Sequence, residues 1–209
     1  MMNRLLFVVA VFCLTAGAAW GQTSDLLITE YVEGSGNNKA LEIFNGTEDA
    51  INLGSYSIDR YSNGATTATS IPLDAVDLPS GETWVIVNPS AEANLLALAN
   101  QTDGNLNFNG DDALVLMFDG SQVVDRFGRV GEDPGSYWSC DDGNTANHTL
   151  RRLSSVCSGD TGITEPFDPC LQWSFFGIDV FTGLGTHIAD CGAVGNSAPS
   201  WGSLKASFR

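Results

Sequence analysis

Short runs of apolar, β-branched and aromatic residues recur along this chain, and each is followed by residues that favour turns. Leu26 to Val32 forms the first run and Ala40 to Phe44 the second. Between them, Gly34 to Asn38 supplies Gly and Asn, which tolerate the positive φ of tight turns. The pattern therefore predicts an opening β-hairpin over residues 30–45.

The same alternation continues through most of the chain. Further strands are predicted over 51–53, 56–61, 84–88, 113–118 and 123–130, with weaker candidates at 148–153 and 180–181. Turn signals at intervals of about eight to twelve residues, with few helical signals, are typical of all-β sandwiches and barrels. The sequence therefore predicts an all-β domain.

The segments between these strands carry different signals. Ser90 is a candidate cap for one short helix that reaches Ala99. In 103–111, polar residues alternate with Leu106 and Phe108, which favours a strand with one wet face over a calcium loop. The Ser/Thr/Gly-rich segment 62–70 is expected to be an exposed loop.

The two ends of the chain are expected to lie outside the domain. Residues 1–21 have the basic start and short apolar run of a secretory signal, with cleavage between Gly21 and Gln22. A retained membrane anchor is the alternative, but the apolar run is short for a span of about 20 residues. The domain is expected to cover 22–191, and 192–209 form a linker and short tail. We expect a secreted or cell-surface protein without a membrane span in the mature chain.

Charge narrows the partner classes. The chain has nine Lys and Arg residues and 25 Asp and Glu residues, which gives a net charge of −16. Neutralising a phosphate backbone requires Lys and Arg, so direct nucleic-acid binding is not expected. Divalent cations such as calcium are the partners that this charge favours.

Four cysteines, Cys140, Cys157, Cys170 and Cys191, remain after the signal, and they fit an exported, disulfide-bonded protein. Of the three possible pairings we favour Cys140–Cys157 with Cys170–Cys191, because neighbouring pairs close short loops. A zinc site is the alternative, but no Cys-x-x-Cys pair is present.

Candidate chemistry is sparse. No Gly-x-Ser-x-Gly motif is present, and neither His148 nor His187 has the sequence context of a catalytic base, so no catalytic residue is assigned. Metal binding is the main chemical hypothesis, because several carboxylates could converge at one end of the sandwich. The candidate calcium ligands are Glu30, Glu33, Glu42, Asp111 and Asp112. Structural hydrogen bonding is the alternative role for all five, and Asp141 to Asn144 is a second, weaker candidate.

The opening hairpin also contains a charged group set among apolar neighbours. At least one of Glu30, Lys39 and Glu42 is therefore expected to be partly buried, where a charge needs a partner. We predict that Lys39 pairs with Glu30 or with Glu42 and fixes the hairpin.

Three segments carry a family resemblance: ITEYVEGSGNNKALEIFN, INLGSYSIDRYSNG and LNFNGDDALVLMFDGSQVVDRFGRVGEDPG. Together with the later HTLRR, FDPCLQW and FTGLGTH, they resemble the lamin-tail domain in its bacterial, exported form, over residues 25–187. The resemblance implies an immunoglobulin-like β-sandwich. The ending PSWGSLKASFR resembles a short tail of exported bacterial proteins, which suggests sorting or surface retention.

For function, the resemblance implies an exported, non-enzymatic interaction or surface-targeting module. Its partner would be a protein, a glycan or a cell-surface component, contacted through loops at an end of the sandwich. An exposed aromatic and Asn/Gly-rich patch there would mark the contact surface. The alternatives are an accessory subunit of an extracellular nuclease or phosphatase, and a calcium-dependent adhesion module.

Overall fold

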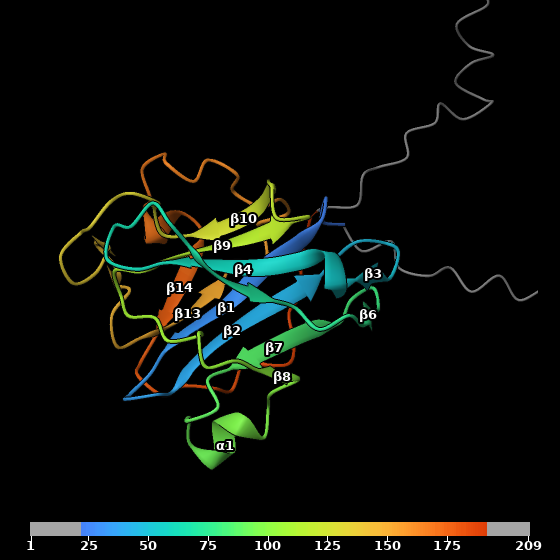
Figure 1. The fold of residues 1–209 in the computed structure, drawn as a ribbon, viewed down its shortest axis with the longest axis horizontal. Helices are drawn as coiled ribbons and strands as arrows, with labels where there is room; N and C mark the ends of the chain where they lie inside the picture. The colour runs from blue at the N-terminus through green and yellow to red at the C-terminus, as the bar shows by residue number, and fades with distance from the viewer. Residues whose placement is uncertain (1–21, 192–209) are drawn as a thin grey trace, which may run out of the picture.

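Two β-sheets pack face to face in the computed structural model, which describes residues 22–191 (Figure 1). The larger sheet has six strands in the order β14-β13-β1-β2-β7-β8, antiparallel except for the β7–β8 pair. Its strands are β1 (Leu26–Glu33), β2 (Lys39–Asn45), β7 (Thr83–Val87), β8 (Gln101–Thr102), β13 (Thr149–Arg152) and β14 (Trp173–Phe176). The all-β sandwich predicted from the sequence is confirmed.

The smaller sheet has four antiparallel strands in the order β10-β9-β4-β5. They are β4 (Tyr56–Tyr61), β5 (Thr69–Pro72), β9 (Ala113–Phe118) and β10 (Gln122–Phe127). Two-stranded ribbons join β3 (Ile51–Asn52) to β6 (Asp77–Leu78) and β11 (Ser139–Cys140) to β12 (Gly143–Asn144). Short helices lie at η1 (Leu53–Ser55), α1 (Ala93–Leu96) and η2 (Pro169–Leu171).

The main core lies between the two sheets and is built from alternate residues of their strands. Tyr31 is fully buried there, and its ring stacks on Phe127 at 3.9 Å and on Phe108 at 4.8 Å between centroids. Burying a large apolar side chain contributes about 1.5–3 kcal/mol, and this layer contains the largest of the buried clusters.

Each sheet is also covered on its outer face. Segment 130–163 places Val130, Trp138 and Ile163 against the outer side of β9. On the other side, α1 and residues 177–191, which we call the C-terminal strap, place Leu95, Phe181 and Leu184 against the outer side of the larger sheet. Because both of its faces are covered, every residue of β1 and β2 is buried.

The observed helix α1 is shorter than the helix predicted from Ser90 to Ala99. Helix α1 begins after Glu92 rather than at Ser90, and Leu95 is its only buried residue. The Asn88 side chain accepts a hydrogen bond from Ser90 N, and Asn38 Oδ1 accepts one from Glu92 N. These two bonds hold the chain in a turn, so the helix starts later.

The strand predicted over 103–111 is wrong. Leu106 and Phe108 are buried, as their alternation suggested, but this segment makes no strand ladder. It crosses from β8, in one sheet, to β9, in the other, so neither sheet can continue through it. The predicted pairing at 180–181 is also wrong, because these residues belong to the strap.

All four cysteines form disulfides, but the predicted pairing is wrong. The bonds are Cys140–Cys170 and Cys157–Cys191. The prediction paired cysteines that are adjacent in the sequence, because such pairs close short loops. In the folded protein, the pairing depends instead on which cysteines the packed segments bring together. The β11 ribbon lies against η2, and the strap returns to the segment after β13, where Asp190 N donates to Ser154 O at 2.7 Å.

Within residues 22–191, no helix is long and apolar enough to cross a membrane. The predicted signal segment, including Gly21, and the predicted tail lie outside the described residues, which begin at Gln22.

Candidate binding site at one end of the sandwich

The β1–β2 turn fixes the partner of the buried lysine. The strands pair symmetrically about Gly36, so Glu33 lies opposite Lys39. Lys39 Nζ contacts Glu33 Oε1 at 2.8 Å and donates to Gly34 O at 2.7 Å. The prediction that Lys39 pairs with Glu30 or Glu42 is therefore wrong. Both of those residues lie further along the strands, and neither forms an ion pair with Lys39.

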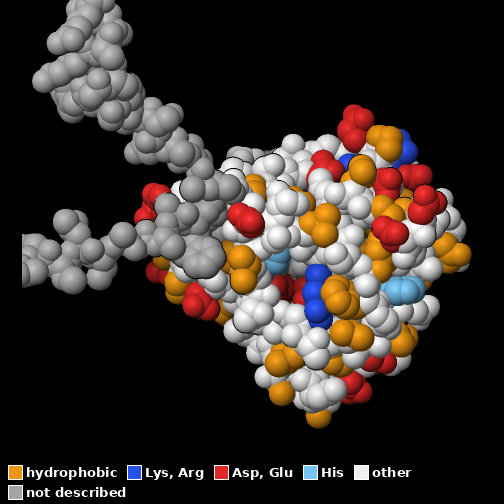
Figure 2. All heavy atoms as spheres, turned by 180° about the vertical axis from the view of Figure 1, so that it is seen from behind, with side chains coloured by type: hydrophobic (Ala, Val, Ile, Leu, Met, Phe, Trp, Pro, Cys, Tyr) orange, Lys and Arg blue, Asp and Glu red, His pale blue; other side chains and the backbone are white. Residues whose placement is uncertain are grey.

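Glu30 and Glu42 face each other across the same two strands, on the outer face of the larger sheet. Glu30 Oε2 accepts a hydrogen bond from Arg151 Nε at 3.1 Å, and β13 places Arg151 directly opposite Glu30. Glu42 accepts from Thr29 Oγ1 at 2.7 Å and from Gly185 N, in the strap, at 2.6 Å. Acidic side chains show around the rim of this face and basic ones at few places (Figure 2).

Burial under the strap sets the ionisation of these two carboxyls. Burial raises the pKa of Glu30 from an ordinary 4.5 to about 7, against the opposing attraction of Arg151. Burial also raises the pKa of Glu42. Glu30 Oε1 has no hydrogen-bond partner among the described residues, which fits a carboxyl that gains a proton easily.

Hydrogen bonds from the β1–β2 turn to Asp179 hold the strap against that turn. Asp179 accepts hydrogen bonds from Ser35 N at 2.9 Å, from Ser35 Oγ at 2.7 Å and from Asn38 Nδ2 at 3.0 Å. Although burial alone would raise it, these hydrogen bonds lower the pKa of Asp179. The same carboxylate therefore fixes both the strap and the β1–β2 turn.

Asp112 joins the end of β4 and the loop that follows it to the segment before β9. Its carboxylate accepts from Asn63 N at 2.9 Å and from Asn109 N at 3.3 Å, and Arg60 Nη1 lies 3.4 Å from Oδ2. The side chain of Asp111 is also buried, and burial raises its pKa; its Oδ1 has no partner among the described residues. Asp112 is thus a structural crosslink.

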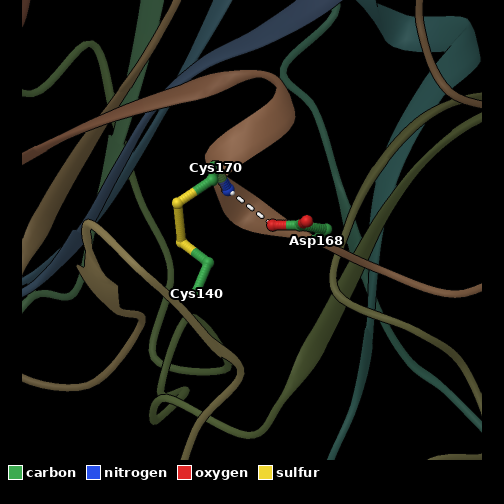
Figure 3. A group of neighbouring side chains, drawn as sticks. All are labelled: Cys140, Asp168 and Cys170. Carbon is green, nitrogen blue, oxygen red and sulfur yellow. Dashed lines mark hydrogen bonds between the residues drawn. A yellow bond between two sulfur atoms is a disulfide. The ribbon is translucent and has the colours of Figure 1, made fainter.

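The structure does not bring the five predicted calcium ligands together. Glu30 and Glu42 lie under the strap, whereas Glu33 pairs with Lys39 and Asp112 with Arg60. One group of His, Cys, Asp and Glu side chains in the described residues is close enough to hold a metal: Cys140, Asp168 and Cys170 (Figure 3). Its two sulfurs are bonded to each other, and Asp168 accepts from Cys170 N at 3.0 Å, so its ligand atoms already have other roles.

A polar pocket of about 390 Å³ opens between the loops at this end, and we call it the end pocket. The β1–β2 turn, the end of β4 and the segment before β9 line it. Its residues are Gly36, Lys39, Arg60, Ser62, Asn63, Asn107, Phe108, Asn109 and Asp112. The expected Asn/Gly-rich patch is present, but Phe108 is only 1% exposed, so the pocket presents no aromatic surface.

Three asparagines in the end pocket combine a fixed backbone with an exposed side chain. Asp112 binds the backbone N–H groups of Asn63 and Asn109, and Arg60 Nη1 donates to Asn107 O at 2.9 Å. The three side-chain amides make no hydrogen bond to any other described residue and are exposed. Three amide groups, each with an N–H₂ donor and a carbonyl acceptor, therefore face solvent from a rigid frame.

The two histidines lie in unrelated surroundings. His148 Nδ1 is 2.6 Å from Ala146 O, and its ring meets Phe175 edge-on. His187 lies in the strap, and its ring packs against Phe44. Burial lowers the pKa of His187 to about 4, which keeps it neutral at pH 7.

Sequence reasoning missed Arg60 and Arg151 as ion-pair partners, and the three pocket asparagines as a group. One available signal was the turn centre: counting outward from Gly36 places Glu33 opposite Lys39 and Glu30 opposite Glu42. No comparable signal joins Asn63 to Asn109, because their proximity depends on two loops meeting.

The two packed sheets define a β-sandwich. The family model of the lamin tail domain matches residues 21–131. The chain belongs to the lamin tail domain family, whose domains are non-enzymatic and immunoglobulin-like. Among curated proteins, none matches this chain.

The matched residues include β1 to β10 and end before the first disulfide cysteine. The resemblance to the family was expected to extend to residue 187, whereas the family model matches no further than residue 131. Strands β13 and β14, both disulfides and the strap therefore lie beyond the match, although β13 and β14 complete the six-stranded sheet.

Proposed function

We propose that this chain is an exported, non-enzymatic interaction module that contacts a cell-surface component through the end pocket. The observation that carries this proposal is the set of three exposed asparagine amides held on a fixed backbone by Asp112 and Arg60. A preorganised set of polar groups binds without first losing conformational freedom, which favours affinity. Two disulfides support export, because such bonds persist in oxidising compartments.

The binding test compares matched asparagine variants. Asn107→Ala with Asn109→Ala removes two pocket amides, whereas Asn105→Ala removes an exposed amide of the same segment outside the lining. We expect the wild-type protein and the Asn105 variant to co-sediment with bacterial cell-envelope material, and the double variant to be lost from it. Equal sedimentation of all three proteins, or of none, would contradict the proposal.

The rival functions need separate measurements. Incubation of the purified mature protein with DNA and with phosphoesters, with and without calcium or magnesium, is expected to give no turnover. Robust metal-dependent turnover would overturn the non-enzymatic assignment. Calcium-dependent adhesion predicts a higher melting midpoint in calcium than in chelator, so an unchanged midpoint excludes that alternative.

A further inference from the structure

The charges that line the end pocket are already balanced. Lys39 contacts Glu33 at 2.8 Å, and Arg60 contacts Asp112 at 3.4 Å. Both carboxylates also accept backbone N–H groups, Glu33 from Asn147 and Asp112 from Asn63 and Asn109. A charged ligand would thus have to compete with internal partners, on a protein whose net charge of −16 repels anions.

What remains available in the pocket is neutral hydrogen bonding. Each amide of Asn63, Asn107 and Asn109 offers a carbonyl acceptor beside an N–H₂ donor. A sugar hydroxyl donates one hydrogen bond and accepts others, so adjacent hydroxyls can match both halves of such an amide. Phe108, which is buried, is the only apolar side chain of the lining, so the pocket offers nothing to a hydrophobic or base-stacking ligand.

The topology around the pocket disfavours an extended peptide. Peptides often bind by adding a strand to an open sheet edge. The strands that reach the pocket are β2 and β4, and both lie inside their sheets, between β1 and β7 and between β9 and β5. The pocket volume of about 390 Å³ lies near the lower limit of the range for small-molecule pockets, roughly 300–1,000 Å³.

From this combination we propose that the end pocket binds a neutral, hydroxyl-rich saccharide unit of a surface glycan, an inference that rests on the proposed function. The side-chain amides of Asn63, Asn107 and Asn109 contact the hydroxyls. Asp112 and Arg60 act as positioning residues, because they hold the backbone of these asparagines and pair with each other.

The amide protons of the asparagines allow a direct test. The ¹⁵N-labelled mature protein, with its disulfides intact, is titrated by NMR with glucose, galactose, mannose and N-acetylglucosamine, and with glucuronic acid as a charged comparator. At least one neutral sugar is expected to shift the side-chain N–H₂ signals of Asn63, Asn107 and Asn109 in a saturable way. The signals of Asn105 should stay in place.

Two variants complete the test. Asn107→Ala with Asn109→Ala should weaken the sugar affinity read from the Asn63 signals roughly thirtyfold, since two lost hydrogen bonds of about 1 kcal/mol each total about 2 kcal/mol. Asn105→Ala should bind like the wild type. Asn63 itself is left unchanged, because its φ of 49° makes alanine unsuitable there.

Failure of this inference differs from failure of the proposed function. If no neutral sugar shifts these signals, or if glucuronic acid binds more tightly than glucose, the saccharide class is wrong. The pocket would still serve a protein or peptide if envelope binding is lost in the double variant. If envelope binding is unaffected by the double variant, the proposed function itself is wrong.

Discussion

Replacing Glu30 by glutamine tests how the strap controls buried charge. Glutamine has the same shape and can still accept the hydrogen bond from Arg151, but it does not titrate. In the folded protein burial raises the pKa of Glu30 from 4.5 to about 7. Each pKa unit is worth about 1.4 kcal/mol, so the full change corresponds to about 3 kcal/mol.

The direction follows from proton binding. Between pH 4.5 and about 7, the folded protein holds a proton on Glu30 that the unfolded chain has released. The contribution of Glu30 to the free energy of unfolding is therefore fully present below pH 4.5 and is lost as the pH rises through about 7. His187 acts in the opposite direction, since its lowered pKa makes the unfolded chain bind the extra proton between about pH 4 and 6.5.

These opposite contributions make the difference between two proteins more informative than one stability curve. Urea unfolding at several pH values, with disulfides intact, gives the free energy of unfolding of wild type and Glu30→Gln. From pH 4.5 to pH 8, the variant should gain about 3 kcal/mol relative to the wild type. The exposed Glu48→Gln is the control for the loss of one carboxylate at the surface.

The outcome that would refute the reasoning is a constant difference between Glu30→Gln and the wild type across this pH range. It would mean that Glu30 stays ionised in the fold, with the strap leaving it accessible to water. A change of the opposite sign would mean that Arg151 outweighs burial.

Three further predictions concern the contacts that hold the sheets and strap. Asp125→Ala should cost about 3–5 kcal/mol in urea unfolding, because it leaves Arg152, its fully buried partner at 2.7 Å, without a counter-charge; Arg129→Ala, at a partly exposed pair, should cost at most about 1 kcal/mol. Equal costs would contradict this contrast. Gly183→Ala should destabilise by about 1–3 kcal/mol, because a Cβ there would overlap the Arg151 and Glu30 side chains, whereas Gly104→Ala, with open space around it, should not; a neutral Gly183 variant would show that the strap can shift. Replacing both Cys157 and Cys191 by serine should lower the free energy of unfolding by about 3–4 kcal/mol for a loop of 34 residues, and an unchanged value would mean that the strap packs equally well without the bond.

The fold class could be predicted from the sequence alone. Alternating apolar residues predicted β1, β2, β4, β7 and β9 to within one residue at each end, because the period of a strand is local and each run carries its own turn signals. Strand β10 was also predicted, but it ends at Phe127, three residues earlier than expected. The family could be recognised for the same reason, since its motifs lie within these strands and their turns. The four cysteines also predicted that disulfides form, but their sequence positions did not predict the pairing.

Tertiary structure decided which polar side chains meet. The ion-pair partner of Glu30 comes from β13, which lies more than a hundred residues further along the chain and places Arg151 opposite Glu30. The end pocket exists because a β4 loop and the segment before β9 converge on Asp112. Local periodicity carries no information about such contacts, since they depend on how separate segments pack.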